Sequence, residues 1–287
     1  MVKEEELTIA ARDGYRLAAT RRQPESGAPH SIALITAAAA VPAGFYRRFA
    51  NYLAERGFDT VTFDYRGVGG SRPESLKGFP GRMRDWAALD TTAAVDFAAA
   101  LNPGKPLVYV GHSFGGQALG LLPNNGKVSR ALLVASQAGY WRYLGGFEHY
   151  RVYFMLRFVA PAVVRTLGYL PAGVGLGDGL PREVFLEWAG WCMKPGYLFD
   201  DETLETRVNY PKFKGALRAI GLADDPWATP KAIARLLQGY TGTKPEHLTI
   251  EPRDVGAAKI GHFFYFRPEF REALWKDAAD WLAAAGK

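Results

Sequence analysis

The residue with the clearest chemical signature in this chain is Ser113, which lies in the sequence Gly111-His112-Ser113-Phe114-Gly115. A serine hydroxyl becomes a useful nucleophile when a neighbouring base removes its proton. Glycines two positions before and after it allow a strained, tight turn, because a Cβ there would collide with the adjoining strand or helix. The apolar run before the motif and the helical pattern after it therefore predict a nucleophilic serine on a strand-to-helix turn.

Histidine is the usual base for such a serine, and the chain has five candidates: His30, His112, His149, His247 and His262. Only His262 follows the last predicted strand and precedes the last predicted helix, where this kind of site places its base. We therefore predict His262 as the base. A buried structural histidine is the alternative interpretation.

The base needs an acidic partner that fixes its tautomer and stabilises its charged form. The acid should follow a strand that lies between the serine and the histidine. Asp224 and Asp225 come directly after the apolar run 216–222. Since adjacent aspartates often form turns or helix caps, we predict that only Asp225 is the acid and keep Asp224 as the alternative.

Backbone amides are predicted to bind the oxyanion that forms during attack on a carbonyl group. One donor should be the amide of Phe114, the residue after the serine. The second should come from the alanine run after the strand 31–36, where we choose Ala39. Ala38 and Ala40 are predicted to lie beside the substrate, since small side chains let the backbone approach it; a simple tight turn is the alternative.

The elements around these residues alternate between short apolar strands and amphipathic helices. Strands are predicted at 7–11, 15–20, 31–36, 59–64, 107–110, 130–136, 216–222 and 247–251. Helices are predicted at 45–56, 83–101, 114–122, 230–240 and 268–285. The first two strands flank Asp13-Gly14, a strong hairpin signal. This order predicts an α/β fold with a mostly parallel, eight-stranded sheet and helices on both faces.

The alternation stops between Trp141 and Pro211, where aromatic residues are frequent and helices are predicted at 150–167 and 181–193. We interpret 141–211 as a helical insertion in one domain formed by 1–140 and 212–287. Such an insertion can form a lid over the serine, although ordinary packing would also use aromatic residues. Candidate substrate-binding residues near or in the insertion are Tyr140, Trp141, Trp188 and Trp191.

Composition narrows the functional classes. The 287-residue chain has a net charge of +6, but its basic residues are scattered, which argues against nucleic-acid binding. A single cysteine, Cys192, excludes an internal disulfide and a cysteine-cluster metal site. The acidic start of the chain and the lack of a long apolar run predict a cytoplasmic protein without a membrane span.

The chain resembles the α/β-hydrolase superfamily over nearly its whole length, and in particular predicted serine hydrolases related to the serine aminopeptidase and monoglyceride lipase group. The resemblance is carried by 64–71, 111–116, Asp225-Pro226-Trp227 and Gly261-His262-Phe263. It implies the α/β-hydrolase fold, a triad of Ser113, Asp225 and His262, and a lid. Many relatives have His-Gly before the oxyanion loop, where this chain has only alanines.

Together these features predict a serine esterase that acts through an acyl-enzyme on a small-molecule ester with an apolar or aromatic group. No metal or organic cofactor is expected. An amide or peptide hydrolase and an acyltransferase remain open, since both use the same residues. So does a non-catalytic ligand-binding protein on the same scaffold. The oligomeric state is also open, with a homodimer as one option.

Overall fold

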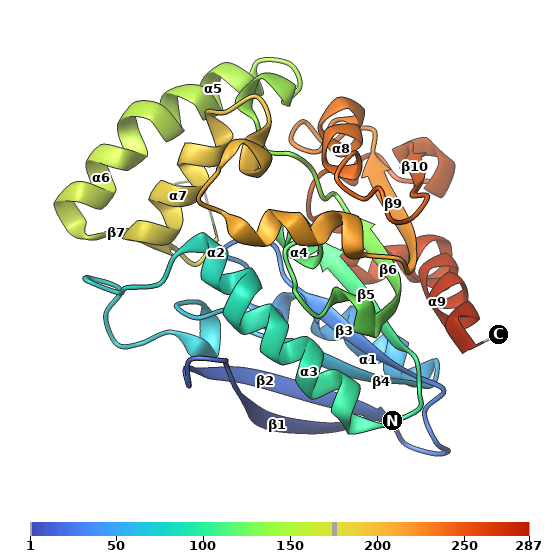
Figure 1. The fold of residues 1–287 in the computed structure, drawn as a ribbon. Helices are drawn as coiled ribbons and strands as arrows, with labels where there is room; N and C mark the ends of the chain where they lie inside the picture. The colour runs from blue at the N-terminus through green and yellow to red at the C-terminus, as the bar shows by residue number, and fades with distance from the viewer. Residues whose placement is uncertain (1, 174–176, 287) are drawn as a thin grey trace.

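A sheet of eight strands forms the centre of the computed structural model, which describes residues 2–173 and 177–286 (Figure 1). In spatial order the strands are β1 (Val2–Ala10), β2 (Arg16–Pro24), β4 (Phe58–Phe63), β3 (Ser31–Thr36), β5 (Leu107–His112), β6 (Val128–Val134), β9 (Ala216–Leu222) and β10 (Glu246–Ile250). β2 is antiparallel to β1 and to β4, and the remaining neighbours are parallel. The predicted mostly parallel sheet is confirmed.

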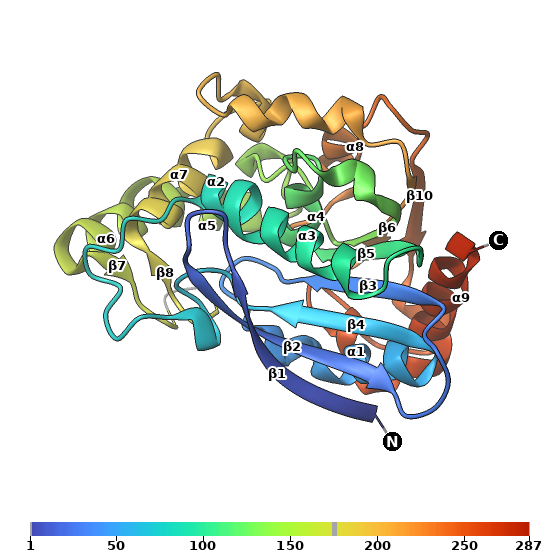
Figure 2. The same cartoon turned by 60° about the horizontal axis from the view of Figure 1, so that its bottom comes forward.

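The antiparallel part is the predicted hairpin, and it lies at one edge of the sheet (Figure 2). Gly14 supplies the left-handed conformation that its turn requires, with φ 86°. β1 begins five residues before the predicted strand, at Val2. Its first residues are mostly charged and exposed, so they show no apolar alternation that the sequence could reveal.

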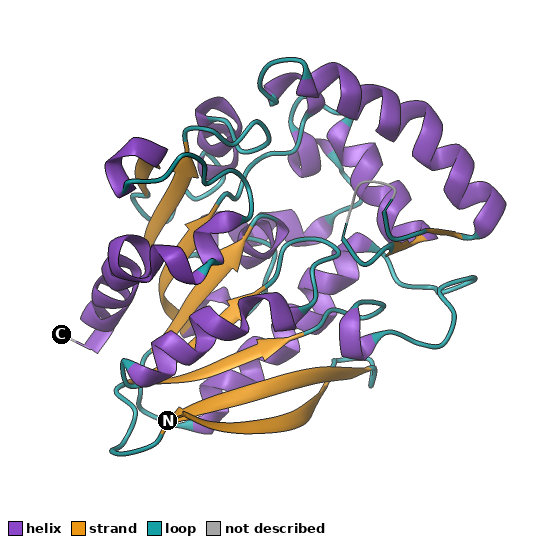
Figure 3. Ribbon diagram, turned by 180° about the vertical axis from the view of Figure 1, so that it is seen from behind, coloured by secondary structure: helices purple, strands orange, loops and turns teal. Residues whose placement is uncertain are grey.

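Helices cover both faces of the sheet (Figures 1 and 3). α3 (Thr92–Leu101) and α4 (Phe114–Leu119) lie on one face, while α1 (Arg47–Glu55) and α9 (Lys276–Ala283) lie on the other. Phe49 of α1 packs edge to face on Trp275, just before α9, with ring centroids 5.4 Å apart. The central strands β3, β4 and β5 are buried along their whole length, as parallel strands between two helical layers should be.

Several helices contain turns that the sequence pattern does not reveal. The predicted helix 83–101 consists of α2 (Met83–Asp85), a π-helical turn and α3. The π-helical turns are Trp86–Thr91, Met155–Val159 and Arg271–Trp275. The 3₁₀ turns are Ala43–Tyr46, Gly69–Ser71, Asn125–Lys127, Trp141–Tyr143, Tyr197–Asp200, Glu205–Lys212, Pro252–Val255, Phe264–Phe266, Pro268–Phe270 and Ala284–Gly286.

The segment 141–211 connects β6 to β9 and is mainly helical, as predicted. It contains α5 (Glu148–Phe154), α6 (Ala160–Leu167) and α7 (Arg182–Cys192), while α8 (Pro230–Leu237) follows β9. β7 (Tyr169–Leu170) and β8 (Leu180–Pro181) form a short antiparallel pair that the sequence did not predict, because two residues show no alternation. α5 and α6 continue into each other and lie at the outside of the molecule (Figure 1).

None of the helices in the described ranges 2–173 and 177–286 is both long enough and apolar enough to cross a bilayer.

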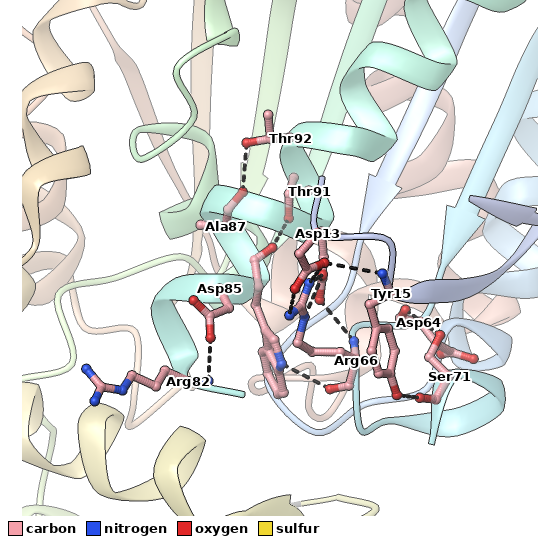
Figure 4. A network of polar contacts seen from close by, with 12 residues as sticks. Asp13, Tyr15, Asp64, Arg66, Ser71, Arg82, Asp85, Ala87, Thr91 and Thr92 are labelled. Carbon is pink, nitrogen blue, oxygen red and sulfur yellow. Dashed lines mark hydrogen bonds and ion pairs between the residues drawn. The ribbon is translucent and has the colours of Figure 1, made fainter. Parts of the chain in front are cut away.

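A buried arginine joins three segments that are distant in sequence (Figure 4). The Arg66 guanidinium, in the loop after β4, donates to both oxygens of Asp13 in the hairpin turn, at 2.7 and 2.9 Å. It also donates to Asp90 in the first π-helical turn at 2.8 Å, and the Arg66 carbonyl accepts a bond from Trp86 Nε1 at 3.1 Å. Asp90 is fully buried, whereas the Asp13 side chain is partly exposed. This network holds the turn that contains Arg66.

The strand order positions the candidate residues. Thr36 of β3 pairs with Gly111 of β5, and Val134 of β6 pairs with both His112 and Ile220. The carboxyl ends of β3, β5, β6 and β9 therefore meet at one edge of the sheet, where ligands bind in open α/β sheets. The loops that follow these strands carry the predicted site.

Candidate active site

Ser113 occupies a strained turn between β5 and α4. Its backbone angles are φ 51° and ψ −114°, a conformation that a residue with a side chain rarely adopts. The flanking glycines are required by space: a Cβ on Gly111 would lie 2.5 Å from the Gly116 Cα, and one on Gly115 would overlap the Thr36 carbonyl oxygen. This is the collision that the sequence pattern anticipates.

His262 and Asp225 are in direct contact. His262 Nδ1 lies 2.7 Å from Asp225 Oδ2, and both side chains are almost completely buried. The other carboxylate oxygen accepts a bond from the Trp227 amide at 2.8 Å. Burial by itself would raise the pKa of Asp225, but the His262 ring and the Trp227 and Ala228 amides outweigh it, so the pKa is lowered. Asp225 is therefore an anion that can orient His262 and stabilise its positive charge.

Asp224 has a separate role in the same loop. Its two oxygens accept bonds from the amides of Ile260 and Gly261, at 2.8 and 2.9 Å. Gly261 takes the left-handed conformation, with φ 56°. Asp224 thus anchors the loop that presents His262, while its neighbour contacts the ring.

Ser113 and His262 line one cavity of about 310 Å³. Its wall is mainly apolar and also includes Ala38, Ala39, Val41, Phe114, Trp188 and Trp227. Among the residues that the structure describes, no direct hydrogen bond joins the Ser113 hydroxyl to the His262 ring. Hydrogen bonds between catalytic groups are often long when no substrate is bound. A smaller cavity of about 60 Å³ shares Trp188 and Trp227 with it and extends beneath α5 and α6, where Leu156, Phe185 and the buried Cys192 line it.

The remaining substrate-binding candidates are not among the residues that line the larger cavity. Ala40 is buried and its carbonyl accepts a bond from the Asp178 amide at 2.8 Å. Trp191 donates to Asp201 at 2.8 Å. Tyr140 packs on Tyr143, and Trp141 packs on Tyr153, with ring centroids 5.1 and 4.5 Å apart. Aromatic content indicated a pocket, but it does not say which way each ring points.

Sequence reasoning missed Trp227, Gln117, Gln137 and Phe263, all of which line the larger cavity. Trp227 is the most informative of these, because its ring centroid lies 5.2 Å from that of His262. Its indole Nε1 donates to Glu148 of α5 at 2.7 Å, which connects the segment 141–211 to the predicted triad. The signal was available, since Trp227 stands two residues after Asp225.

The alanine loop that follows β3 has one amide already in use. The Ala38 N–H donates to the Tyr46 hydroxyl at 2.9 Å. The Ala39 N–H has no hydrogen-bond partner within the described residues, and the Phe114 N–H is unpaired as the first amide of α4. The amides of Ala39 and Phe114, two residues that line the cavity with Ser113, are thus without a partner among the described residues.

His112 is fully buried next to Ser113, and both of its ring nitrogens are occupied. Nδ1 lies 2.7 Å from the Tyr46 hydroxyl, and Nε2 lies 2.8 Å from the His262 carbonyl oxygen. Burial, and then the neighbouring His262, lower the pKa of His112 to about 3. His112 is therefore neutral at ordinary pH and cannot act as the base for Ser113.

Among the residues that the structure describes, no cluster of three His, Cys, Asp or Glu side chains is arranged to hold a metal ion.

The sequence of residues 28–172, half of the chain, matches the model of the serine aminopeptidase family S33. The chain belongs to this family of α/β-hydrolases. The matched part of this S33 family member contains the alanine loop and the Ser113 turn, whereas Asp225 and His262 lie outside it. A comparison with curated protein sequences gave no match.

Solved structures share the fold of this S33 family member. It is similar to a soluble variant of monoglyceride lipase from Saccharomyces cerevisiae, with 14% identity and a TM-score of 0.70 over 99% of this chain and 94% of that one. An esterase from Pyrococcus furiosus has 14% identity and a TM-score of 0.63, over 99% and 93%. An esterase from Exiguobacterium antarcticum has 14% identity and a TM-score of 0.62, over 97% and 99%. Identities this low establish the fold alone.

Proposed function

We propose that the protein is a serine hydrolase that cleaves carboxylic esters through an acyl-enzyme. The proposal rests on one observation above all: His262, bonded through Nδ1 to the buried Asp225 at 2.7 Å, lines the same cavity as Ser113. The strained backbone of Ser113, its free neighbouring amides and the membership of a serine hydrolase family support it.

In the proposed reaction the Ser113 Oγ attacks the ester carbonyl and His262 Nε2 takes its proton. The amides of Phe114 and Ala39 bind the oxyanion of the tetrahedral intermediate. The intermediate then expels the alcohol, which receives the proton from His262. A water molecule loses a proton to His262, attacks the acyl-enzyme and releases the carboxylic acid, which restores the Ser113 hydroxyl.

The cavity supports an apolar or aromatic substrate of modest size. Val41, Trp188, Trp227 and Phe263 contribute apolar walls around Ser113, and the smaller cavity beneath α5 and α6 continues them. The segment 141–211 would serve as the lid, since its residue Trp188 lines both cavities. Apolar walls favour an aliphatic or aryl group over a charged one.

Labelling with a serine-directed fluorophosphonate tests the proposal. We expect a single adduct on Ser113, which Ser113→Ala abolishes and His262→Ala strongly reduces, as found by mass spectrometry of the intact and digested protein. A folded protein that takes up no adduct would support the rival reading, a non-catalytic binding protein, and would overturn ours.

Substrate panels separate the enzymes that share this machinery. We expect p-nitrophenyl esters of short and medium acyl chains to be cleaved faster than aminoacyl anilides. A reversed order would support an amide or peptide hydrolase. Acyl transfer to an added alcohol in excess of hydrolysis would instead support an acyltransferase.

A further inference from the structure

A chain of three buried hydrogen bonds runs behind Ser113. The Ala38 amide contacts the Tyr46 hydroxyl at 2.9 Å, and that hydroxyl contacts His112 Nδ1 at 2.7 Å. His112 Nε2 then contacts the His262 carbonyl oxygen at 2.8 Å. All four residues are buried, so water does not compete for these bonds.

Chemistry fixes the direction of every bond in this chain. A carbonyl oxygen can only accept, so His112 Nε2 carries the proton and Nδ1 is the acceptor. The Tyr46 hydroxyl must therefore donate to Nδ1, and its oxygen is left to accept from the Ala38 N–H. Each donor has one acceptor, and no second tautomer satisfies all three bonds.

This series of hydrogen bonds connects the three segments that carry the proposed oxyanion donor, the serine and the base. Ala38 belongs to the oxyanion loop after β3, and His112 is the last residue of β5, immediately before Ser113. His262 belongs to the loop that Asp224 anchors. The Ala38 amide is bound to Tyr46, whereas the amide of Ala39, which lines the cavity, has no partner within the described residues.

We propose that Tyr46 and His112 are positioning residues of this hydrolase. They hold the oxyanion loop and the His262 loop in place relative to Ser113. They also leave the Ala39 amide as the second oxyanion donor. The inference rests on the proposed function. Neither side chain lines the larger cavity, so both act through the backbone of other residues. Their effect should appear in the transition state, where the oxyanion and the imidazolium form, rather than in substrate binding.

Tyr46→Phe is the direct test, because it removes one oxygen and preserves the ring. We expect kcat for a p-nitrophenyl ester to fall about 10- to 100-fold with KM changed less than about threefold, since complete loss of an oxyanion donor costs about 100- to 1,000-fold. Tyr52→Phe is the matched control. It lies six residues further, beside Trp275, and its hydroxyl has no hydrogen bond within the described residues. Its kcat should match the wild type.

Inhibitors separate positioning from a merely structural role. A trifluoromethyl ketone forms a tetrahedral adduct with an oxyanion, so its affinity should fall in Tyr46→Phe by the same factor as kcat/KM. The affinity of an uncharged ester analogue that stays unreacted should not change. A purely structural role would lower the melting temperature and leave both the inhibitor affinity and the kcat of the folded fraction unchanged.

His112 offers a second route if Tyr46→Phe does not fold. His112→Gln places an amide N–H near the position of Nε2, and His112→Asn places an oxygen near Nδ1, so each variant keeps one of the two bonds. We expect both to retain more activity than His112→Leu, which keeps neither.

The outcomes separate this inference from the proposed function. If the wild type takes up no fluorophosphonate, both are wrong. If the wild type is labelled at Ser113 and folded Tyr46→Phe keeps kcat within twofold, only the positioning role is overturned. Equal activity of His112→Leu, His112→Asn and His112→Gln would overturn it too.

Discussion

Two adjacent aspartates, Asp224 and Asp225, illustrate how neighbouring carboxylates acquire different tasks from their partners. Asp224 accepts hydrogen bonds from two backbone amides. Asp225 accepts one from the His262 ring and one from a backbone amide. The sequence placed both after β9 and favoured Asp225, but only the direction of each side chain shows the division. Their substitutions should therefore affect different properties.

Asp225→Asn should lower kcat about 1,000- to 10,000-fold, because an amide in place of the carboxylate favours the wrong tautomer of His262. Asp224→Asn should keep kcat within about tenfold, since it alters only the anchoring of the loop. Steady-state kinetics on one ester, with the melting temperature of each variant, gives the comparison. Similar losses of kcat in both variants would contradict the assignment.

His112 should make the stability of the protein depend on pH. The unfolded imidazole titrates near pH 6.5 and the folded one near pH 3, so between these values only the unfolded chain binds the extra proton. The stability that neutral His112 contributes is thus complete above pH 6.5 and is lost as the pH falls toward 3.

Between pH 7 and pH 5 the wild type should lose about 2 kcal/mol more unfolding free energy than His112→Gln, whose side chain does not titrate. Urea unfolding at both pH values measures this difference. Parallel losses in the two proteins would show that His112 is protonated in the folded state.

At the scale of the elements, two helical glycines have opposite consequences: Gly115 lies in the first turn of α4, and Gly190 lies near the end of α7. The Gly115 position has no room for a Cβ, because the Thr36 carbonyl oxygen occupies it. Gly190, near the end of α7, is exposed, has an ordinary helical backbone and leaves open space within 4 Å of where a Cβ would lie. The same substitution should therefore have opposite signs at the two sites.

Gly115→Ala should destabilise the protein by about 2 to 4 kcal/mol and reduce Ser113 labelling, because the elbow must shift. Gly190→Ala should stabilise it by about 0.5 to 1 kcal/mol, since alanine loses less backbone freedom in a helix. Chemical denaturation of the two variants beside the wild type measures both. A destabilising Gly190→Ala would mean that the open space at α7 is filled in solution.

The same scale shows what the sequence could and could not predict. Apolar runs located the buried strands well, and β9 has the bounds that were predicted. The sequence pattern did not predict the π-helical turns, because one extra residue in a helix leaves the apolar period almost unchanged. Ser113 was identifiable from its glycines, and His262 and Asp225 were chosen from chain order. Tyr46 could not be found, since an aromatic residue on an amphipathic helix does not reveal its hydroxyl partner.

At the scale of the whole molecule, Arg66 connects the edge hairpin, the loop after β4 and the first π-helical turn (Figure 4). Its two carboxylate partners differ in environment: Asp90 is fully buried, and Asp13 is partly exposed. A buried charge that loses its partner is costly, whereas an exposed one is solvated by water.

Arg66→Met should therefore destabilise the protein by about 3 to 5 kcal/mol, because it leaves the Asp90 carboxylate unpaired. Adding Asp90→Leu should recover much of this loss, while Asp13→Ala alone should cost about 1 kcal/mol or less. Urea unfolding of the four proteins provides the measurement. Equal destabilisation by Arg66→Met and Asp13→Ala would contradict this account of the network.

The single cysteine, Cys192, can report how often the helices around the smaller cavity separate. Cys192 is buried in the wall of the smaller cavity, and its burial raises the pKa of the thiol. An uncharged alkylating reagent should therefore modify it only when α5, α6 and α7 separate, at a rate that measures how often they do so. A bound ester analogue should slow this modification. The natural thiol of Cys192 can therefore report the rate at which the smaller cavity opens, without an introduced probe.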